Sequence, residues 1–561
     1  MANVGFKLAQ YQYLKLKDWL FEASLPLWSS VGTDHKNGGF FEKIDKSVVP
    51  IEAPRRTRVV CRQIYSFGAA GAMGWKGDAR GAVEHGWTFL KSNCMNADGS
   101  VIANVDVLSG RRQTRFDLYD HAFALFGLCS SARALEGNHQ EIEMLALKCL
   151  DAMYGGWKHP SAGFEEACPP IEPLRSNPHM HVFEAALAWS ELARSENKGI
   201  WIALANDIGN LCLSRFLSPE NGAIREYYYH NWTVSADEVG SPIEPGHQFE
   251  WAWLLARWGR LTGRKEALIA ARRLVEIGET FGVAEDKGLV INGLNHDLSP
   301  HDCAFRLWPQ TERIKAWLMM AELAMGPTDR NFAMEKVAKA AEGLIVFLSE
   351  IPAGLWRDRL SFDGLTIEEA SPASSLYHIV CAIEEMHSFL HPRLPRPALF
   401  LDRDGVIIED TGYVGGHDGI RLIDGIVETI RHFRDKGYYI FVVTNQSGVG
   451  RGYYDEDDYN LVRAKITNEL KAQNVSVDDE RASPYYIKSK TPQYLRDGNW
   501  RKPNPGMILD IAAEWNVDKK NSLLIGDRPT DLEAASAADL RGVLFTGGNL
   551  FEFLKEQRLI P

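Results

Sequence analysis

Apolar and polar positions divide the 561-residue chain into two parts with different periodicities. Up to about residue 390, apolar residues recur at helical spacing, in stretches that each open on a polar residue. These polar heads are Arg62, His121, His181, His247, Glu312 and His378. They follow one another at intervals of 59, 60, 66, 65 and 66 residues, and a period near 60 predicts one helical hairpin in each repeat.

Six helical hairpins can close into a ring of inner and outer helices. Closure would gather the six polar heads at one mouth of the barrel, and the tryptophan-rich stretch 251–253 fits an inner helix packed on both sides. An open helical solenoid with polar caps is the alternative. Such a solenoid has no need for histidines and an arginine at equivalent positions, so we predict an all-α barrel domain at residues 1–390.

Beyond residue 397 the pattern changes to short apolar runs that alternate with helical stretches. Each run ends in polar residues: 398–401 leads into Asp402 and Asp404, 441–443 into Thr444 and Asn445, and 523–526 into Asp527. Strands that alternate with helices predict a parallel sheet, which collects ligands at the carboxyl ends of its strands. One such cluster alone is usually a turn, but the ordered series predicts an α/β, Rossmann-like domain at residues 398–561.

A proline-rich stretch separates the two predicted domains. Residues 391–397 contain three prolines within a short polar segment. Such a segment cannot continue a helix and acts as a stiff spacer. We therefore predict a linker at 391–397.

Composition narrows the class of protein. Hydrophobic residues make up 45% of the chain and charged residues 24%, as in ordinary globular proteins. The net charge of −12, without a long basic run, argues against a nucleic-acid partner. No apolar run is long enough to span a membrane, and the eight cysteines show no metal-ligand clustering. These features predict a cytoplasmic protein with small-molecule partners and leave a homo-oligomer open.

The carboxylate pair Asp402 and Asp404 predicts phosphoryl transfer. Strand alternation would put the two side chains on one side of the chain, where they repel unless a cation or a proton intervenes. One aspartate can attack phosphorus while the other shuttles the proton. Arg501 and Lys502 add fixed positive charge just before the helical stretch that begins at Gly506.

These motifs resemble the haloacid dehalogenase phosphatases over about residues 396–555. The motifs are Asp-Arg-Asp-Gly at 402–405, Thr-Asn-Gln-Ser-Gly at 444–448, Arg-Lys-Pro at 501–503 and Gly-Asp at 526–527. The resemblance implies that Asp402 becomes an aspartyl phosphate and that Asp404 is the general acid/base. It further implies phosphate binding by Thr444, Asn445, Arg501 and Lys502, and Mg²⁺ binding by Asp402, Asp404 and Asp527.

The details of the motifs look like the branch that contains heptose bisphosphate and histidinol phosphate phosphatases. That branch usually carries a zinc loop of cysteines and histidine before the Arg-Lys-Pro motif. Residues 484–500, the corresponding stretch, contain neither Cys nor His. The resemblance to this branch therefore does not identify the substrate of the domain.

The polar heads of the barrel suggest acid–base chemistry. His181 and Glu184 lie three residues apart, as do His247 and Glu250, so each pair shares one face of a helix. A neighbouring carboxylate orients an imidazole and raises its pKa. A single buried histidine is more often a hydrogen-bonded core residue, and it is the shared phase across repeats that favours a functional site.

The repeats resemble the N-acylglucosamine 2-epimerase superfamily over about residues 10–390, most closely its mannose-6-phosphate isomerase type. Matching stretches are 61–67, 118–123, 177–184, 244–251, 306–313 and 374–378. The resemblance implies an (α/α)6 barrel and metal-free enediol chemistry. It implies that His247 and His378 are the acid/base pair, that Arg62 polarises the sugar oxygen, and that His181, Glu184, Glu250 and Glu312 support them. Trp308 would stack on the sugar.

Two predicted sites on one chain suggest consecutive steps. The first interpretation is a bifunctional enzyme that interconverts fructose 6-phosphate and mannose 6-phosphate and hydrolyses a sugar phosphate. The alternatives are a barrel that isomerises or epimerises unphosphorylated sugars, a heptose phosphate isomerase, or a non-catalytic sugar-binding barrel that regulates the phosphatase. Arginines 55, 56, 58, 111, 112 and 175 flank the predicted mouth and could hold a phosphate, although a solvated loop explains each of them equally well.

Overall fold

The computed structural model describes residues 4–235, 243–392, 394–410, 412, 420–489, 491–495 and 499–560. The chain divides into two compact units. The larger comprises Leu8–Met320 and Glu335–His387, and the smaller comprises Ser388–Pro561 with Met1–Lys7 and Ala321–Met334. Arg393 of the predicted linker lies outside the described residues. Among the described helices, none combines the length and the apolar character needed to cross a bilayer.

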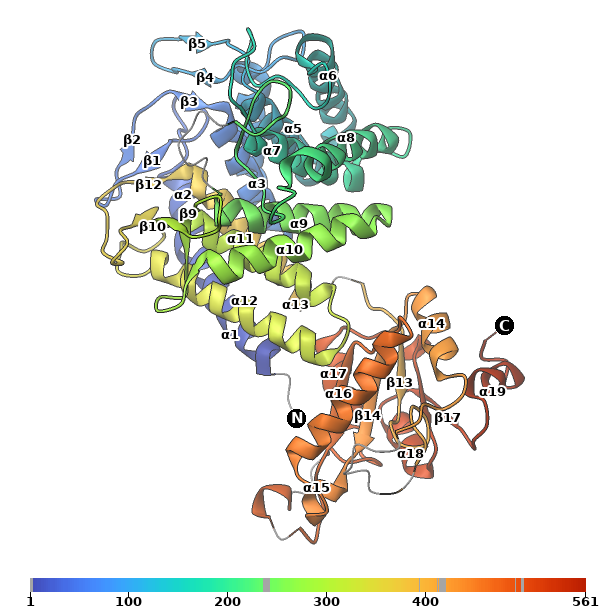
Figure 1. The fold of residues 1–561 in the computed structure, drawn as a ribbon. Helices are drawn as coiled ribbons and strands as arrows, with labels where there is room; N and C mark the ends of the chain where they lie inside the picture. The colour runs from blue at the N-terminus through green and yellow to red at the C-terminus, as the bar shows by residue number, and fades with distance from the viewer. Residues whose placement is uncertain are drawn as a thin grey trace. The chain divides into compact units, whose positions relative to one another are not determined.

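The larger unit is built from inner and outer helices in alternation (Figure 1). The inner helices are α3 (Thr57–Ala72), α5 (Leu118–Ala134), α7 (Ser176–Leu192), α9 (Pro245–Thr262), α11 (Leu307–Glu322) and α13 (Leu376–Leu390). The outer helices are α1 (Val4–Trp19), α2 (Leu25–Ser30), α4 (Ala79–Phe89), α6 (His139–Trp157), α8 (Lys198–Leu211), α10 (Lys265–Phe281) and α12 (Pro327–Leu348).

Burial distinguishes the two sets of helices. Most residues of α5, α7 and α9 are buried, as expected for helices that are packed on both sides. Helix α10 instead buries a single stripe that includes Ala267, Ala271, Leu274 and Gly278. The ring closes between α3 and α13, where Tyr65 donates a hydrogen bond to Glu384 at 2.5 Å. The predicted barrel of six helical hairpins is therefore the observed architecture.

Each of four inner helices uses its fourth residue to anchor a neighbouring loop. His121 and His179 accept hydrogen bonds from the backbone N–H groups of Val101 and Phe164, at 3.0 and 3.2 Å. Gln248 and Gln310 accept equivalent bonds from Ile224 and Val290, at 2.8 and 2.9 Å. His121 is therefore a structural anchor, and its prediction as a polar head at the mouth is wrong.

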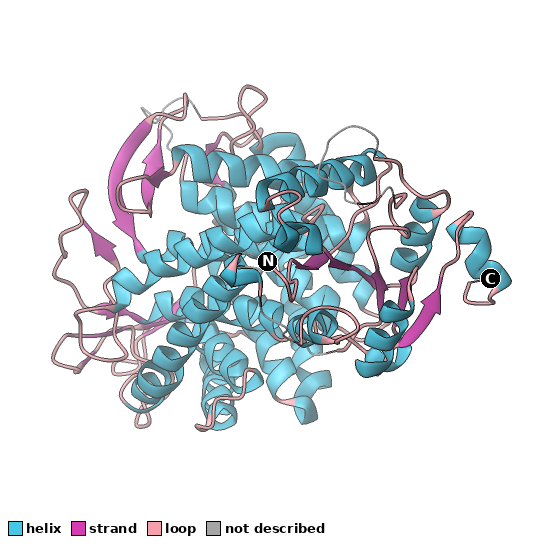
Figure 2. Ribbon diagram, turned by 90° about the horizontal axis from the view of Figure 1, so that it is seen from below, coloured by secondary structure: helices cyan, strands magenta, loops and turns pink. Residues whose placement is uncertain are grey.

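Short strands connect the hairpins at the N-terminal ends of the inner helices. They are β1 (Lys43–Ile44), β2 (Pro50–Ile51), β3 (Arg55–Arg56), β4 (Asn104–Val105), β5 (Arg112–Gln113), β6 (Leu174–Arg175), β7 (Tyr227–Tyr228), β8 (Val283–Ala284), β9 (Leu289–Leu294), β10 (Pro300–Arg306), β11 (Arg359–Leu360) and β12 (Ser371–Pro372). Figure 2 shows these strands at the margin of a largely helical body. They form the rim of the barrel.

The smaller unit contains a five-stranded parallel sheet in the order β15-β14-β13-β16-β17. The strands are β13 (Ala398–Leu401), β14 (Tyr439–Asn445), β15 (Asp479–Ser483), β16 (Leu523–Gly526) and β17 (Arg541–Leu544). The helices are α14 (Ile426–Asp435), α15 (Ser447–Arg451), α16 (Glu456–Ala472), α17 (Gly506–Glu514), α18 (Pro529–Ala537) and α19 (Leu550–Glu556).

Strand β13 is buried on both faces. Leu399 and Leu401 belong to one apolar core with residues of α14, α16 and α19, while Ala398 and Phe400 belong to another with residues of α17 and α18. This alternation follows from the two-residue period of a strand. Because β13 lies between β14 and β16, the strand order reverses at its carboxyl end, where open α/β sheets bind their ligands.

Candidate active sites

A cavity of about 380 Å³ opens at the rim of the barrel, among the N-terminal turns of the inner helices. Six of the predicted residues line it: Arg62, His181, His247, Glu250, Trp308 and His378. The other two, Glu184 and Glu312, are buried and hydrogen-bonded to lining histidines. The structure thus brings the predicted barrel residues together in one place.

Each of the three histidines bonds a carboxylate through Nδ1. The Nδ1 atoms of His181 and His378 lie 3.1 and 2.9 Å from carboxylate oxygens of Glu184 and Glu312. The Nδ1 atom of His247 lies 2.9 Å from Glu226. Because a carboxylate can only accept, each Nδ1 carries a proton and each Nε2 is left for the cavity.

The two central histidines have opposite protonation preferences. Burial lowers the pKa of His247, but the carboxylates of Glu226 and Glu244 outweigh it and raise that pKa to about 10. Burial also lowers the pKa of His378, and the charges of Arg62 and Lys315 lower it further, well below its ordinary value. At neutral pH the cavity therefore holds one imidazolium that can donate a proton and one imidazole that can accept one.

Trp308 and Arg62 complete the cavity. The ring of Trp308 lies close to both histidines, with its centroid 5.0 Å from that of His247 and 5.9 Å from that of His378. The guanidinium of Arg62 donates a hydrogen bond to the hydroxyl of Tyr119 at 2.8 Å. Its central carbon lies over the ring of Phe123, 4.2 Å from the ring centroid. Its Nε is buried without a hydrogen-bond partner among the described residues.

The second cavity, of about 530 Å³, lies at the carboxyl ends of the strands in the smaller unit. Its lining includes the predicted residues Asp402, Asp404, Thr444, Asn445, Arg501 and Lys502. The ammonium of Lys502 lies 2.9 Å from Asp402 and 2.6 Å from Asp531, and it donates to the carbonyl of Val443 at 2.8 Å. A fixed cation therefore lies directly beside the predicted nucleophile.

Asp402, Asp527 and Asp531 form a compact carboxylate group, with one oxygen of each within 4.8 Å of the others. Burial raises the pKa of Asp402 to about 6 and also raises that of Asp527, and the charge of Asp531 adds to both effects. Asp527 Oδ1 is buried without a partner among the described residues. A cluster of oxygen ligands that repel one another fits Mg²⁺.

Gly405 shapes the same site. Its φ of +80° is a conformation that other residues rarely adopt, and an added Cβ would lie 2.6 Å from Asp527 Oδ2. Glycine at position 405 therefore allows the loop after β13 to approach the carboxylate of Asp527.

Asp404 and Asn445 are held by neighbours. The Asp404 carboxylate accepts from Arg403 at 2.9 Å and from Gln446 at 2.8 Å. The amide of Asn445 bonds both backbone groups of Lys502, at 3.0 and 3.1 Å, and so positions that lysine.

Both parts of the chain are similar to known proteins. Residues 39–382 match the family model N-acylglucosamine 2-epimerase (GlcNAc 2-epimerase). The chain belongs to the N-acylglucosamine 2-epimerase family. It is 42% identical over 386 residues to a mannose-6-phosphate isomerase of Rhizobium meliloti (strain 1021), covering 67% of this chain and 97% of that protein. A solved D-mannose isomerase shares the barrel fold, with a TM-score of 0.59 at 19% identity over 66% of this chain and 97% of that one.

The C-terminal part is a HAD-like phosphatase domain. Residues 499–552 match the HAD-hydrolase-like family model. The chain is 44% identical over 161 residues to a D-glycero-beta-D-manno-heptose-1,7-bisphosphate 7-phosphatase of Rhodopseudomonas palustris (strain ATCC BAA-98 / CGA009). That match covers 29% of this chain and 89% of the relative. The protein is thus an epimerase-family isomerase domain fused to a phosphatase domain.

A carboxylate that sequence spacing did not predict supports a histidine of the epimerase-family cavity. Glu226 lies just before β7, outside the helical repeat, and it bonds His247. The i, i+3 spacing pointed instead to Glu250, whose carboxylate lies 4.0 Å from His181. Helical periodicity carries no signal for a residue supplied by a rim strand.

A buried lysine below this cavity was also missed. The Lys315 ammonium lies 2.5 Å from Glu312 and 3.9 Å from the ring centroid of Trp253. Burial alone would lower the pKa of Lys315, but the carboxylates of Glu312 and Glu250 raise it. Lys315 follows Glu312 by three residues on α11, so the spacing that joined His181 to Glu184 would have found this pair as well.

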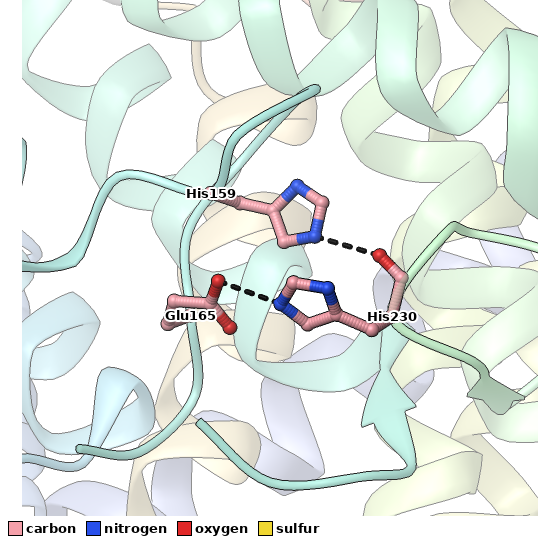
Figure 3. A group of neighbouring side chains, drawn as sticks. All are labelled: His159, Glu165 and His230. Carbon is pink, nitrogen blue, oxygen red and sulfur yellow. Dashed lines mark hydrogen bonds and ion pairs between the residues drawn. The ribbon is translucent and has the colours of Figure 1, made fainter. Parts of the chain in front are cut away.

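A third group of polar side chains lies apart from the cavity and is shown in Figure 3: His159, Glu165 and His230. His159 Nδ1 accepts hydrogen bonds from the backbone N–H of Ser161 at 3.1 Å and the indole of Trp232 at 3.3 Å. Its Nε2 lies 2.8 Å from the His230 carbonyl, which can only accept, so Nε2 carries the proton. Both nitrogens of His159 therefore already form hydrogen bonds. The group is better explained as a set of hydrogen bonds that joins two rim loops than as a metal site.

Proposed function

We propose that the barrel interconverts an aldose phosphate and a ketose phosphate, most directly mannose 6-phosphate and fructose 6-phosphate. The observation that carries the proposal is that a protonated His247 and a neutral His378 both lie beside Trp308 in one cavity. The 42% identity to a mannose-6-phosphate isomerase over nearly its whole length supports the substrate.

The reaction follows from the protonation states. The sugar stacks on Trp308, and neutral His378 removes the proton on the carbon next to the carbonyl. Arg62 stabilises the oxygen on which negative charge develops, and His247 donates a proton to that oxygen. Glu226 and Glu312 keep both imidazoles in the required tautomer. His247 then takes up the hydroxyl proton of the second oxygen, and His378, whose proton exchanges with solvent, protonates the former carbonyl carbon. Both histidines thereby regain their starting protonation states.

We propose that the phosphatase domain hydrolyses a sugar phosphate through Asp402. The Asp402 carboxylate attacks phosphorus and forms an aspartyl phosphate, while Asp404 protonates the departing sugar oxygen. Asp404 then removes a proton from the water that releases phosphate. Lys502, Thr444 and Arg501 would hold the phosphoryl oxygens.

Mg²⁺ would be held by the carboxylates of Asp402, Asp527 and Asp531, and its charge would offset that of the transferring phosphoryl group. Asp404 was also assigned to the metal from the sequence, and that assignment stays a prediction. The phosphatase relative is named for the 7-phosphate of a heptose bisphosphate, so a terminal sugar phosphate is the substrate class we propose.

The free cysteines support a reducing compartment, and we propose the cytoplasm. Small-molecule sugar phosphates are the partners that both proposed sites require.

A panel of sugar phosphates tests both activities at once. Wild-type protein, H378A and D402N would each be scored for isomerisation and for phosphate release. We expect each variant to lose one activity and to keep the other. Isomerisation by H378A at the wild-type rate would refute the proposed barrel mechanism, and phosphate release by D402N would refute the proposed nucleophile.

A further inference from the structure

The proposed substrate carries a phosphate, and the barrel cavity has cations on one side of its rim. Lys43, Arg56 and Arg306 line the cavity close to the starts of α3, α11 and α13. The carboxylates of Glu244 and Glu250 line it from α9 and the residue before that helix. An anionic group on the substrate would therefore be attracted to the cations of this rim.

Four of the arginines near the mouth are committed to carboxylates. Arg55 bonds Asp34 at 2.9 Å, and Arg56 bonds Glu42 at 2.7 Å through its side chain and at 2.8 Å through its backbone N–H. Arg58 bonds Asp120 through two nitrogens at 2.8 and 2.9 Å, and Arg175 bonds Glu166 at 2.7 Å. Because these four guanidinium groups already form ion pairs with carboxylates of the protein, they are poor candidates for binding a substrate phosphate.

Arg306 differs from them. It ends β10, two residues before Trp308, and its side chain is 43% exposed. Its Nε is buried without a hydrogen-bond partner among the described residues. Its nearest carboxylate oxygen, on Asp358, lies 3.8 Å away, too far for a hydrogen bond, and the other oxygen of Asp358 accepts from Ser375 at 2.6 Å. Because the side chain is 43% exposed and Asp358 lies beyond hydrogen-bond distance, the exposed part of the Arg306 guanidinium is available to an anion.

Arg306 also lies where the cavity continues. A second hollow of about 270 Å³ shares Glu244, Arg306 and Trp308 with the main cavity and extends along β9 and β10. A sugar stacked on Trp308 would have its reacting carbons between the histidines and room for a further group beside Arg306. The guanidinium fork matches the geometry of phosphate oxygens.

We infer that Arg306 is the residue that selects phosphorylated sugars, by binding the substrate phosphate at the junction of the two hollows. This inference rests on the proposed isomerase function and makes it more specific. Lys43 supplies a second cation on the same rim. Arg306 takes no part in the proton transfers, so it is a specificity residue.

The test compares R306M with R359M in the D402N background, where the substrate phosphate is not hydrolysed. Arg359 is the matched control, since it pairs with Arg306 across β10 and β11, is similarly exposed, and bonds a surface carboxylate outside the cavity. Steady-state isomerisation of mannose 6-phosphate and of mannose is measured, together with competitive inhibition by inorganic phosphate.

We expect R306M to lose about 10- to 100-fold in kcat/KM for mannose 6-phosphate, the value of one charge-assisted contact. Turnover of mannose should change less than about threefold, inhibition by phosphate should weaken in parallel, and R359M should match the parent. R306K provides a folded variant that keeps the charge but loses the fork, and it should recover only part of the activity.

The outcomes separate this inference from the function on which it rests. If the parent protein isomerises mannose 6-phosphate and R306M does so equally well, the phosphate subsite is wrong and the proposed function stands. Equal losses for mannose and mannose 6-phosphate would also overturn the subsite, because they would assign Arg306 to the cavity in general. If the parent isomerises neither sugar, the proposed function itself is refuted.

Discussion

Replacing Glu226 with glutamine tests how the barrel obtains a protonated histidine. The change keeps the size of the side chain but removes the charge that lies 2.9 Å from His247 Nδ1. A hydrogen bond to a charged group contributes about 1.5–3 kcal/mol, and one pKa unit corresponds to about 1.4 kcal/mol. Since Glu244, 3.7 Å from His247, keeps its charge, we expect the pKa of His247 to fall from about 10 by about one to two units.

The expected readout is the alkaline limb of the isomerisation profile. Measured as kcat/KM against pH in the D402N background, this limb reports His247 in the free enzyme and should move to lower pH by about one to two units in E226Q. At pH 7 the histidine stays protonated, so the remaining loss should be about tenfold and reflect orientation. E276Q, which alters an exposed carboxylate on α10, is the control and should leave the profile unchanged. An unshifted alkaline limb in E226Q would refute the role of Glu226.

The same pair makes a prediction about stability. The pKa of His247 is raised in the folded protein from 6.5 to about 10. Its ionised form therefore stabilises the fold fully below about pH 6.5, and this contribution is lost as the pH rises through about 10. The difference in unfolding free energy between wild type and E226Q should accordingly be largest at low pH and shrink as the pH rises towards 10.

Three further predictions concern the independence of the two sites. H378A should lower isomerisation by about 10²- to 10⁴-fold while phosphate release survives, measured by coupled assays on one preparation; a variant that isomerises normally would contradict the base assignment. EDTA should stop phosphate release and leave isomerisation intact, and added Mg²⁺ should restore the release; isomerisation lost to chelation would contradict the prediction of metal-free barrel chemistry. Residues 1–392 and 395–561, expressed separately, should each fold and keep one activity, and aggregation of both pieces would refute the predicted linker.

The regular helices and strands of both domains could be predicted because the spacing of apolar residues in the sequence reveals their periods. The repeat near 60 residues gave the hairpins, and the apolar runs before Asp402 and Asp527 gave the strand ends of the parallel sheet. It was harder to predict which position of an inner helix faces the cavity. His121 was grouped with the functional heads, but it is the fourth residue of its helix, like His179, and both anchor loops, whereas His181 is the sixth residue and lines the cavity.

Residues supplied by loops and rim strands could not be predicted from periodicity. Glu226 and Arg306 lie on short rim segments whose positions depend on the closed ring. Asp531 follows Asp527 by four residues, and only the turn into α18 brings its carboxylate to Lys502. Such contacts join segments that are separated in the sequence, and a motif identifies only one of the two residues in each contact.

Solvent deuterium incorporation tests the central claim most directly, because it reports proton transfer by the barrel. The D402N protein would be incubated with fructose 6-phosphate in D₂O, and the mannose 6-phosphate formed would be analysed by NMR. The account predicts deuterium at C2 of the product and no labelled product with H378A. Product formed without deuterium, or the same labelling with H378A, would contradict it.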